Sequence, residues 1–127
     1  MFEYILVLTS LAFMIPPFII FLPIWLQYSL FFTACASAAF WSDPINHRNT
    51  ILHLLDGFLA RIIILAIIVY AIVKPTKNPI LFFFMTVIMM TLFYISAIFS
   101  EKEWLSFQHI VCHIGAHISA IGAIYVI

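Results

Sequence analysis

Histidine and aspartate side chains interrupt a few otherwise apolar stretches of this sequence, and they are the residues best suited to chemistry. His109 and His113 are four residues apart, so on a helix they would share one face, and two imidazoles at that spacing can chelate one metal ion such as zinc. Asp56 could ligate the same ion, orient a histidine, or act as a general base on a metal-bound water. Ionisable groups are costly in apolar surroundings, so each of these is a candidate for function.

Three further ionisable residues lie near these candidates. His117 continues the stripe of His109 and His113, with a drift of about 40° per step around an ideal helix. His53 stands three residues before Asp56 and would share its helix face. Arg61 follows Asp56 by five residues, which would point the two side chains about 140° apart. An ion pair between Asp56 and Arg61 is therefore the less favoured alternative, and we expect Arg61 to have another partner.

The composition places these residues in a membrane protein. Of 127 residues, 66% are hydrophobic and only 8% are charged. A soluble domain of this size leaves much of its surface in water, and five acidic plus five basic residues could not cover that surface. The formal net charge is zero and no basic run occurs, so no nucleic-acid partner is expected. We predict one all-α, multi-pass integral membrane domain surrounded by membrane lipid.

Polar segments divide the chain at nearly the spacing that a bilayer requires. About 20 apolar residues cross the hydrocarbon core as a helix, and we predict five transmembrane helices. Their ranges are about 2–21, 23–41, 50–73, 80–99 and 106–127. Pro16 and Pro17 remove two backbone donors, so we expect a kink or a break in the first span. The polar run 42–49 is predicted to be a loop, with Asn49 or Thr50 capping the next helix.

Five spans with short turns alternate in direction, so the candidate residues gather at one depth. The starts of the first, third and fifth spans share one membrane face, here called face A, with the ends of the second and fourth. Ser37 lies about one turn from the end of its span, Asp56 about two turns into the third, and His109 and His113 one to two turns into the fifth. Polar residues scattered at random would not collect in one leaflet on three helices. Arg48 and Lys102 on face A balance Lys74 and Lys77 opposite, so the positive-inside count favours neither orientation.

Other functions remain open for these residues. A histidine pair in a membrane helix can form a hydrogen-bonded seam between helices, as in a non-enzymatic accessory or assembly subunit. Histidines from two helices could also ligate haem iron or relay protons. Five helices enclose only a small cavity, which leaves open a homo-oligomer or an assembly with other membrane subunits.

Three short motifs resemble those of the CREST superfamily of membrane hydrolases, which includes alkaline ceramidases, progestin and adipoQ receptors, and haemolysin-III-like proteins. Ser37-Ala-Ala-Phe-Trp41 is similar to the family's serine followed four residues later by histidine, with tryptophan in the histidine position. Leu54-Leu55-Asp56-Gly57 resembles the leucine and aspartate early in the next helix. Residues 107–113 resemble the family's His-x-x-aromatic-His motif, with Cys112 in the aromatic position. The family core has seven spans, so this chain resembles a shortened and divergent member.

The resemblance implies a membrane-embedded, zinc-dependent hydrolase of a lipid amide or ester. His109 and His113 would hold the zinc ion, and Asp56 would orient or deprotonate the bound water. Ser37 would hydrogen-bond that water or the developing oxyanion. Because Trp41 replaces the usual third histidine, the third ligand would come from His53, with His117 as the alternative and the loop residue His47 as a weaker one.

Overall fold

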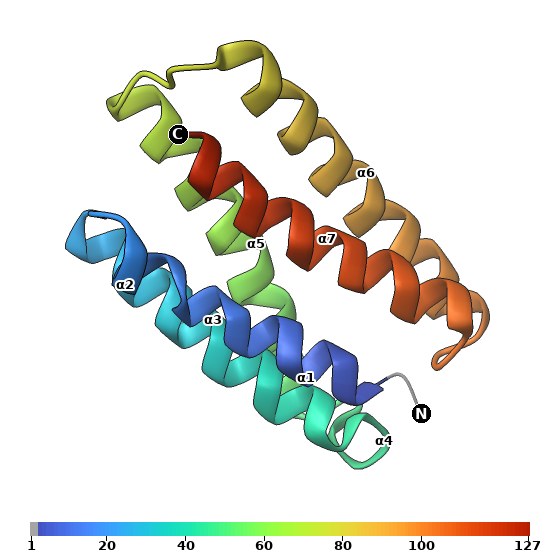
Figure 1. The fold of residues 1–127 in the computed structure, drawn as a ribbon. Coiled ribbons are helices and arrows are strands. Elements are labelled where there is room, and N and C mark those ends of the chain that lie inside the picture. The colour runs from blue at the N-terminus through green and yellow to red at the C-terminus, as the bar shows by residue number, and fades with distance from the viewer. Residues whose placement is uncertain (1–2) are drawn as a thin grey trace.

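The structure is a computed structural model that describes residues 3–127, and all of its regular elements are helices (Figure 1). In chain order they are α1 (Glu3–Leu11), the 3₁₀ turn η1 (Ala12–Met14), α2 (Pro16–Ile19), α3 (Ile24–Ser42), α4 (Pro44–His47), α5 (Ile51–Val73), α6 (Pro79–Lys102) and α7 (Phe107–Val126). The predicted all-α fold is confirmed. The predicted start of the first span, Phe2, lies outside the described residues.

The first predicted span is broken at its prolines, as expected. α1 ends at Leu11, a 3₁₀ turn follows, and α2 begins at Pro16. Proline fits the first turn of a helix because its missing N–H would have no intrahelical acceptor there. The two prolines therefore start a new short helix rather than continuing α1.

The last four predicted helices agree with the structure to within a few residues. Thr50 occupies the N-cap position of α5 without a side-chain cap bond, and its hydroxyl donates to the carbonyl of His47 instead. Ser106 caps α7 by accepting the N–H of His109 at 3.1 Å. The prediction of a plain loop at 42–49 was wrong, because Pro44 starts the four-residue helix α4, which is capped by the Asp43 side chain.

The helices alternate in direction and form one bundle (Figure 1). α3 packs between α1 and α5, α6 packs against α7, and α7 also contacts α1 and α5. The beginning of α1, the helix α4 and the turn between α6 and α7 lie at one end of the bundle, which is face A, at lower right in Figure 1. The helix α2 and the turn between α5 and α6 lie at the other end, here called face B. The predicted grouping of helix ends is confirmed.

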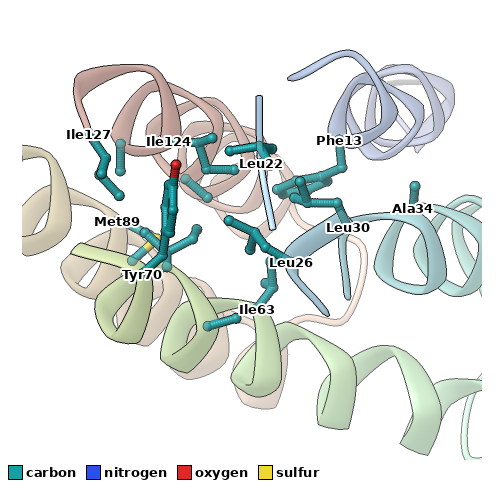
Figure 2. Packing of buried hydrophobic residues seen from close by; sticks show 14 residues of the cluster. Phe13, Leu22, Leu26, Leu30, Ala34, Ile63, Tyr70, Met89, Ile124 and Ile127 are labelled. Atoms are coloured by element: carbon teal, nitrogen blue, oxygen red, sulfur yellow. The ribbon is translucent and has the colours of Figure 1, made fainter. Parts of the chain in front are cut away.

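Two clusters of buried apolar side chains hold the bundle together. The larger one fills the half near face B and includes Leu26, Leu30, Ile63, Ile67 and Ile124 from α3, α5 and α7 (Figure 2). The smaller one lies near face A and consists of four buried side chains, Leu6, Phe40, Trp41 and Ile110. Along α3 and α7, Ser37 and His113 stand between residues of the two clusters, whereas His53 and His109 pack against the smaller one.

Three of the helices described, α5, α6 and α7, are long and apolar enough to cross a membrane. The segment Glu3–Ile19 is a shorter apolar one, and α3 has 19 residues. Large hydrophobic side chains face outward along the bundle, as with Phe18 at 89% exposure, which suits a surface covered by lipid. A helical membrane bundle is supported, whereas the predicted count of five spans is not confirmed by length and composition.

Candidate functional site

Three of the predicted site residues line a single small cavity. Ser37 from α3, Asp56 from α5 and His113 from α7 meet around about 30 Å³ of space, together with His117. Ser37 is 1% exposed and Asp56 is 8% exposed, so both are shielded by the bundle. Positions on three helices that the sequence places at one depth therefore meet in one place.

A chain of hydroxyl groups leads to the carboxylate. The Ser10 hydroxyl donates to Ser37 Oγ at 2.8 Å, and Ser37 in turn hydrogen-bonds the Asp56 side chain. The Ser10 hydroxyl also donates to the carbonyl of Leu6, so its single proton is shared between two acceptors. Ser37 is the hydroxyl that partners the buried carboxylate, which would otherwise be costly.

A second and larger cavity adjoins the first on the side of face A. It has a volume of about 130 Å³ and extends to Ser100 and Trp104 at that end of the bundle. Asp56 and His113 line both cavities, whereas His53 and His109 line only the larger one. Asp56 and His113 therefore stand between an inner space and an outer polar space.

The three histidines of α7 form a ladder in which neighbouring rings meet edge to face. The ring centroids of His109 and His113 are 5.9 Å apart, and those of His113 and His117 are 4.8 Å apart. In each ring Nδ1 is the hydrogen-bonded nitrogen: it contacts Trp104 O at 2.5 Å in His109, Ser96 Oγ at 3.3 Å in His113, and Thr9 Oγ1 at 2.9 Å in His117. A carbonyl can only accept, so His109 Nδ1 bears a proton and Nε2 is the nitrogen left for another partner.

Two tryptophans pack against this ladder at face A. The Trp41 ring lies 5.7 Å from that of His109 and 5.2 Å from that of His113. Trp104 lies 5.4 Å from His109 and 6.3 Å from Trp41. Within residues 3–127 the indole N–H groups of Trp41 and Trp104 are buried without a hydrogen-bond partner, and both side chains line the larger cavity. A buried unpaired donor costs free energy unless an acceptor reaches it.

The donor set does not fit the zinc ion that the CREST resemblance implies. In the part of the chain described, no three His, Cys, Asp or Glu side chains are grouped so that they could hold one metal ion. His109 and His113 supply two imidazoles, but the neighbouring position belongs to Trp41, whose indole N–H can only donate. Zinc at this site stays a prediction that would need the donors to rearrange.

The proposed third ligands lie on either side of the His109 and His113 pair. His53 stacks on Phe40 with centroids 4.7 Å apart, and its Nδ1 accepts the N–H of Asn49 at 3.0 Å. Of the two cavities, His117 lines only the inner one and His53 only the larger one, so His53 and His117 lie apart. The weaker candidate, His47, contacts the carbonyl of Phe40 through Nδ1. Metal ligation by any of these residues stays a prediction.

The expected alternative partner of Arg61 is a backbone group. Its guanidinium donates to the carbonyl of Gly57, one turn earlier on α5, at 3.0 Å. Arg61 is exposed on the bundle surface, whereas Asp56 is buried. This agrees with the large angular separation expected from their spacing.

Sequence reasoning missed the hydroxyl groups that orient the site. Thr9, Ser10 and Ser96 come from α1 and α6, and each bonds a histidine or Ser37. Their one signal in the sequence is depth, since all three are small polar residues at about the level of Ser37 in apolar stretches. Sequence reasoning also gave no role in the site to Trp104, whose carbonyl fixes His109.

Comparison with known proteins gives no match: neither a family model, nor a curated protein, nor a solved structure matches this chain.

Proposed function

We propose that this chain is a membrane-embedded hydrolase that cleaves a lipid amide or ester. The observation that supports this function best is that Ser37, Asp56 and His113, from three helices, line one small cavity. A carboxylate, a hydroxyl and an imidazole at one point are the groups needed to activate water and to protonate a leaving group.

The inner cavity has the size for a reacting water molecule, and Ser37, Asp56 and His113 supply polar groups within its mostly apolar lining. A polar space needs about 10 to 15 Å³ to hold one water, and this cavity offers about 30 Å³. Asp56 would accept a proton from that water while the water oxygen forms a bond to the carbonyl carbon of the substrate. The C–N or C–O bond then breaks, and the proton passes to the leaving nitrogen or oxygen, with His113 as the nearby group able to relay it.

The unpaired indole N–H groups would serve the substrate's carbonyl oxygen. Trp41 and Trp104 line the larger cavity, and each has a buried donor without a partner among the described residues. A carbonyl oxygen placed there becomes more negative as water attacks, so fixed donors would favour the transition state. The substitution of tryptophan for histidine at position 41 would thus provide a hydrogen-bond donor where the resembled family has a metal ligand.

A lipid substrate suits the position of these cavities. The larger one lies near face A and is lined partly by apolar and aromatic side chains, so an acyl chain could remain in the bilayer while its amide or ester reaches Asp56. The CREST resemblance independently implies the same substrate class. The proposed reaction does not require a zinc ion.

We also propose that all five predicted segments cross the membrane. α3 has 19 residues, which is about 28 Å of helix and close to the hydrocarbon thickness of about 30 Å. Its ends lie at opposite ends of the bundle (Figure 1). In a chain with Cys35 and Cys112 replaced by alanine, the exposed variants Phe21→Cys and Ile45→Cys should react with an impermeant thiol reagent from opposite sides of sealed vesicles. Labelling from the same side would contradict a crossing by α3.

The hydrolase proposal is tested with purified protein in vesicles that contain fluorogenic acyl-amide and acyl-ester lipids. Asp56→Asn keeps the side-chain shape but removes the base, and should lower the rate by roughly 10²- to 10⁴-fold. Trp41→Phe should lower it by roughly 10²-fold through loss of one donor. Ser29→Ala, on the same helix as Ser37 but with an exposed hydroxyl bonded to Trp25 O, is the control and should keep the full rate.

Two results would contradict the proposal. One is the absence of amide or ester cleavage by folded wild-type protein. The other is an unchanged rate in folded Asp56→Asn. If replacing the histidines changes helix association while no cleavage occurs, the accessory-subunit alternative is favoured instead.

A further inference from the structure

A polar groove runs along the outer surface of α5 and borders the larger cavity, because His53, Gly57 and Arg61 line both. It has a volume of about 410 Å³ and is lined by Asn49, His53, Leu54, Gly57 and Arg61. Four of these residues recur at intervals of four, so they form one stripe that leads from face A into the apolar part of the helix. None of the stripe's side chains has a role in the proposed hydrolysis, although the stripe borders the larger cavity.

Arg61 makes this groove unusual for a membrane-facing surface. The residue is exposed within a helix that is long and apolar enough to cross a membrane. Its guanidinium donates to the carbonyl of Gly57, and among residues 3–127 no carboxylate is paired with it. A charged side chain in such a segment normally has a partner or faces water. The guanidinium has five N–H donors, and this bond uses only one of them.

The side chain is directed back toward face A. Arg61 lies ten residues after the start of α5, about 15 Å along the helix, but its bond to Gly57 brings the guanidinium one turn nearer the membrane surface. Long cationic side chains extend toward the headgroup layer in this way. Because Gly57 has no side chain, nothing from that turn fills the groove between the guanidinium and the groups above it.

The other polar residues of the groove also present donors. His53 Nδ1 accepts the backbone N–H of Asn49 at 3.0 Å, so in the neutral ring Nε2 bears the proton and can donate. Stacking on Phe40, with the two rings 13° from parallel, fixes that orientation. Asn49 has a φ of 61°, a left-handed conformation that asparagine tolerates and that turns its N–H toward His53. His53 and Gly57, whose carbonyl binds the Arg61 guanidinium, are four residues apart, so the two donor-bearing groups are about one turn apart along α5.

We propose that this groove binds a phosphate-type oxyanion, supplied by the headgroup of an anionic lipid. A phosphate has several acceptor oxygens and a negative charge, which match a guanidinium fork and an imidazole N–H. A free inorganic phosphate would offer the same chemistry, and the experiment distinguishes the two sources. The site does not depend on whether the chain hydrolyses lipids.

The test uses the full chain purified in neutral detergent and mixed with phosphatidylglycerol or with phosphatidylcholine, with bound lipid counted by native mass spectrometry. Wild-type protein should retain phosphatidylglycerol in preference to phosphatidylcholine. Arg61→Gln should weaken that retention by roughly tenfold or more, because a charge-assisted contact is lost. Arg61→Lys keeps the charge without the fork and should fall between the two. Helix content and elution volume check that each variant is folded.

The matched control is Arg48→Gln. Arg48 is the other arginine near face A, and its guanidinium lies over the Trp104 ring at 4.6 Å rather than in the groove. Arg48 is near the groove without lining it, since Trp104 lies 5.0 Å from His53, so its replacement should weaken retention of phosphatidylglycerol much less than Arg61→Gln does. Lipid that stays bound when inorganic phosphate is added identifies the headgroup as the ligand, whereas displacement by inorganic phosphate identifies a soluble phosphate. Equal retention of both lipids, wild-type retention in Arg61→Gln, or an equal loss in Arg48→Gln would overturn the proposal.

Discussion

The two halves of the bundle are built from the same helices but differ in what those helices bury. Near face B, α3, α5 and α7 bury mostly apolar side chains, among them Leu26, Ile67 and Ile124 (Figure 2). Toward face A, the same three helices bury Ser37, Asp56 and His109. The apolar half needs no specific partners, whereas each polar group of the other half requires one.

α5 displays this contrast along a single face. Asp56 and Ile67 are eleven residues apart, about three full turns plus 20°, so they point in nearly the same direction. Asp56 is buried beside Ser37, and Ile67 is fully buried in the apolar cluster. A carboxylate is tolerated at the first position because hydroxyls reach it, and no such group surrounds the second. The difference between the halves therefore lies in their neighbours rather than in the helix itself.

The largest expected change comes from placing a third metal-ligating imidazole in the polar half. In Trp41→His, a third imidazole would replace the indole that lies 5.7 and 5.2 Å from the rings of His109 and His113. Three histidines can hold zinc with an open fourth position, so bound zinc should rise from background to about one equivalent. Metal analysis of the purified variant beside wild type measures this.

The controls for that prediction are Trp41→Phe and the double variant Trp41→His with His113→Ala. Both should bind no more zinc than background, because each lacks one of the three imidazoles. Wild-type protein that already carries one equivalent of zinc would contradict our account of the donor set and would favour what the CREST resemblance implies.

The next effect is expected from placing a carboxylate in the apolar half. Ile67→Asp buries an acid without a hydroxyl to receive it, and should lower the free energy of unfolding by about 3 to 5 kcal/mol. Ile67→Leu keeps the apolar volume and should cost less than about 1.5 kcal/mol. Unfolding in mixed micelles, followed by circular dichroism, compares them. If Ile67→Asp were as stable as wild type, the apolar half would have to contain a polar partner or water that the contacts do not indicate.

Most of the architecture could be predicted from the sequence because the membrane imposes it. Apolar segments of bilayer length define α5, α6 and α7, and the proline pair breaks the first segment as expected. The short helix α4 could not be predicted in the same way. Four residues in a polar run show no periodicity, and its stability depends on the Asp43 cap and on Pro44 at its first turn.

The sequence predicted the depth of the site residues in the bundle but not the rotation of each helix about its own axis. Alternating helices place Ser37, Asp56 and His113 at one level, and all three line the same cavity. Spacing along a helix does not say how that helix is turned about its axis relative to its neighbours. For this reason the sequence could not decide that His53 faces one cavity and His117 another. Nor could it indicate that the Trp41 ring packs beside His109 and His113.

A smaller difference in stability between the two halves is expected where α6 packs against α7. A methyl group on Gly115 would lie 2.8 Å from Cδ1 of Leu92, and one on Gly122 would contact Cε of Met85 still more closely. Leucine is branched and confined, whereas the thioether chain of methionine can change rotamer. We expect Gly115→Ala to cost about 1 to 3 kcal/mol of unfolding free energy and Gly122→Ala to cost less.

Unfolding in mixed micelles measures both glycine variants, with Gly57→Ala as a control. An added Cβ at Gly57 would meet only the Arg61 guanidinium, at an ordinary contact distance of 3.5 Å. A larger loss in Gly122→Ala than in Gly115→Ala would mean that packing near face B is the more rigid of the two.

The smallest effect concerns a single hydroxyl of the polar half. Thr9→Val keeps the side-chain shape but removes the partner of His117 Nδ1, a bond of 2.9 Å between α1 and α7. Hydrogen bonds between membrane helices contribute about 0.6 kcal/mol on average, and we expect a loss of that size. Thr33→Val is the matched control, because Thr33 donates to the carbonyl of Ser29 on its own helix and links no second helix. Thr9→Val should therefore be the more destabilising of the two in mixed-micelle unfolding. Equal or reversed losses would mean that the histidine ladder is held by packing alone, and the polar half would then follow the same rule as the apolar one.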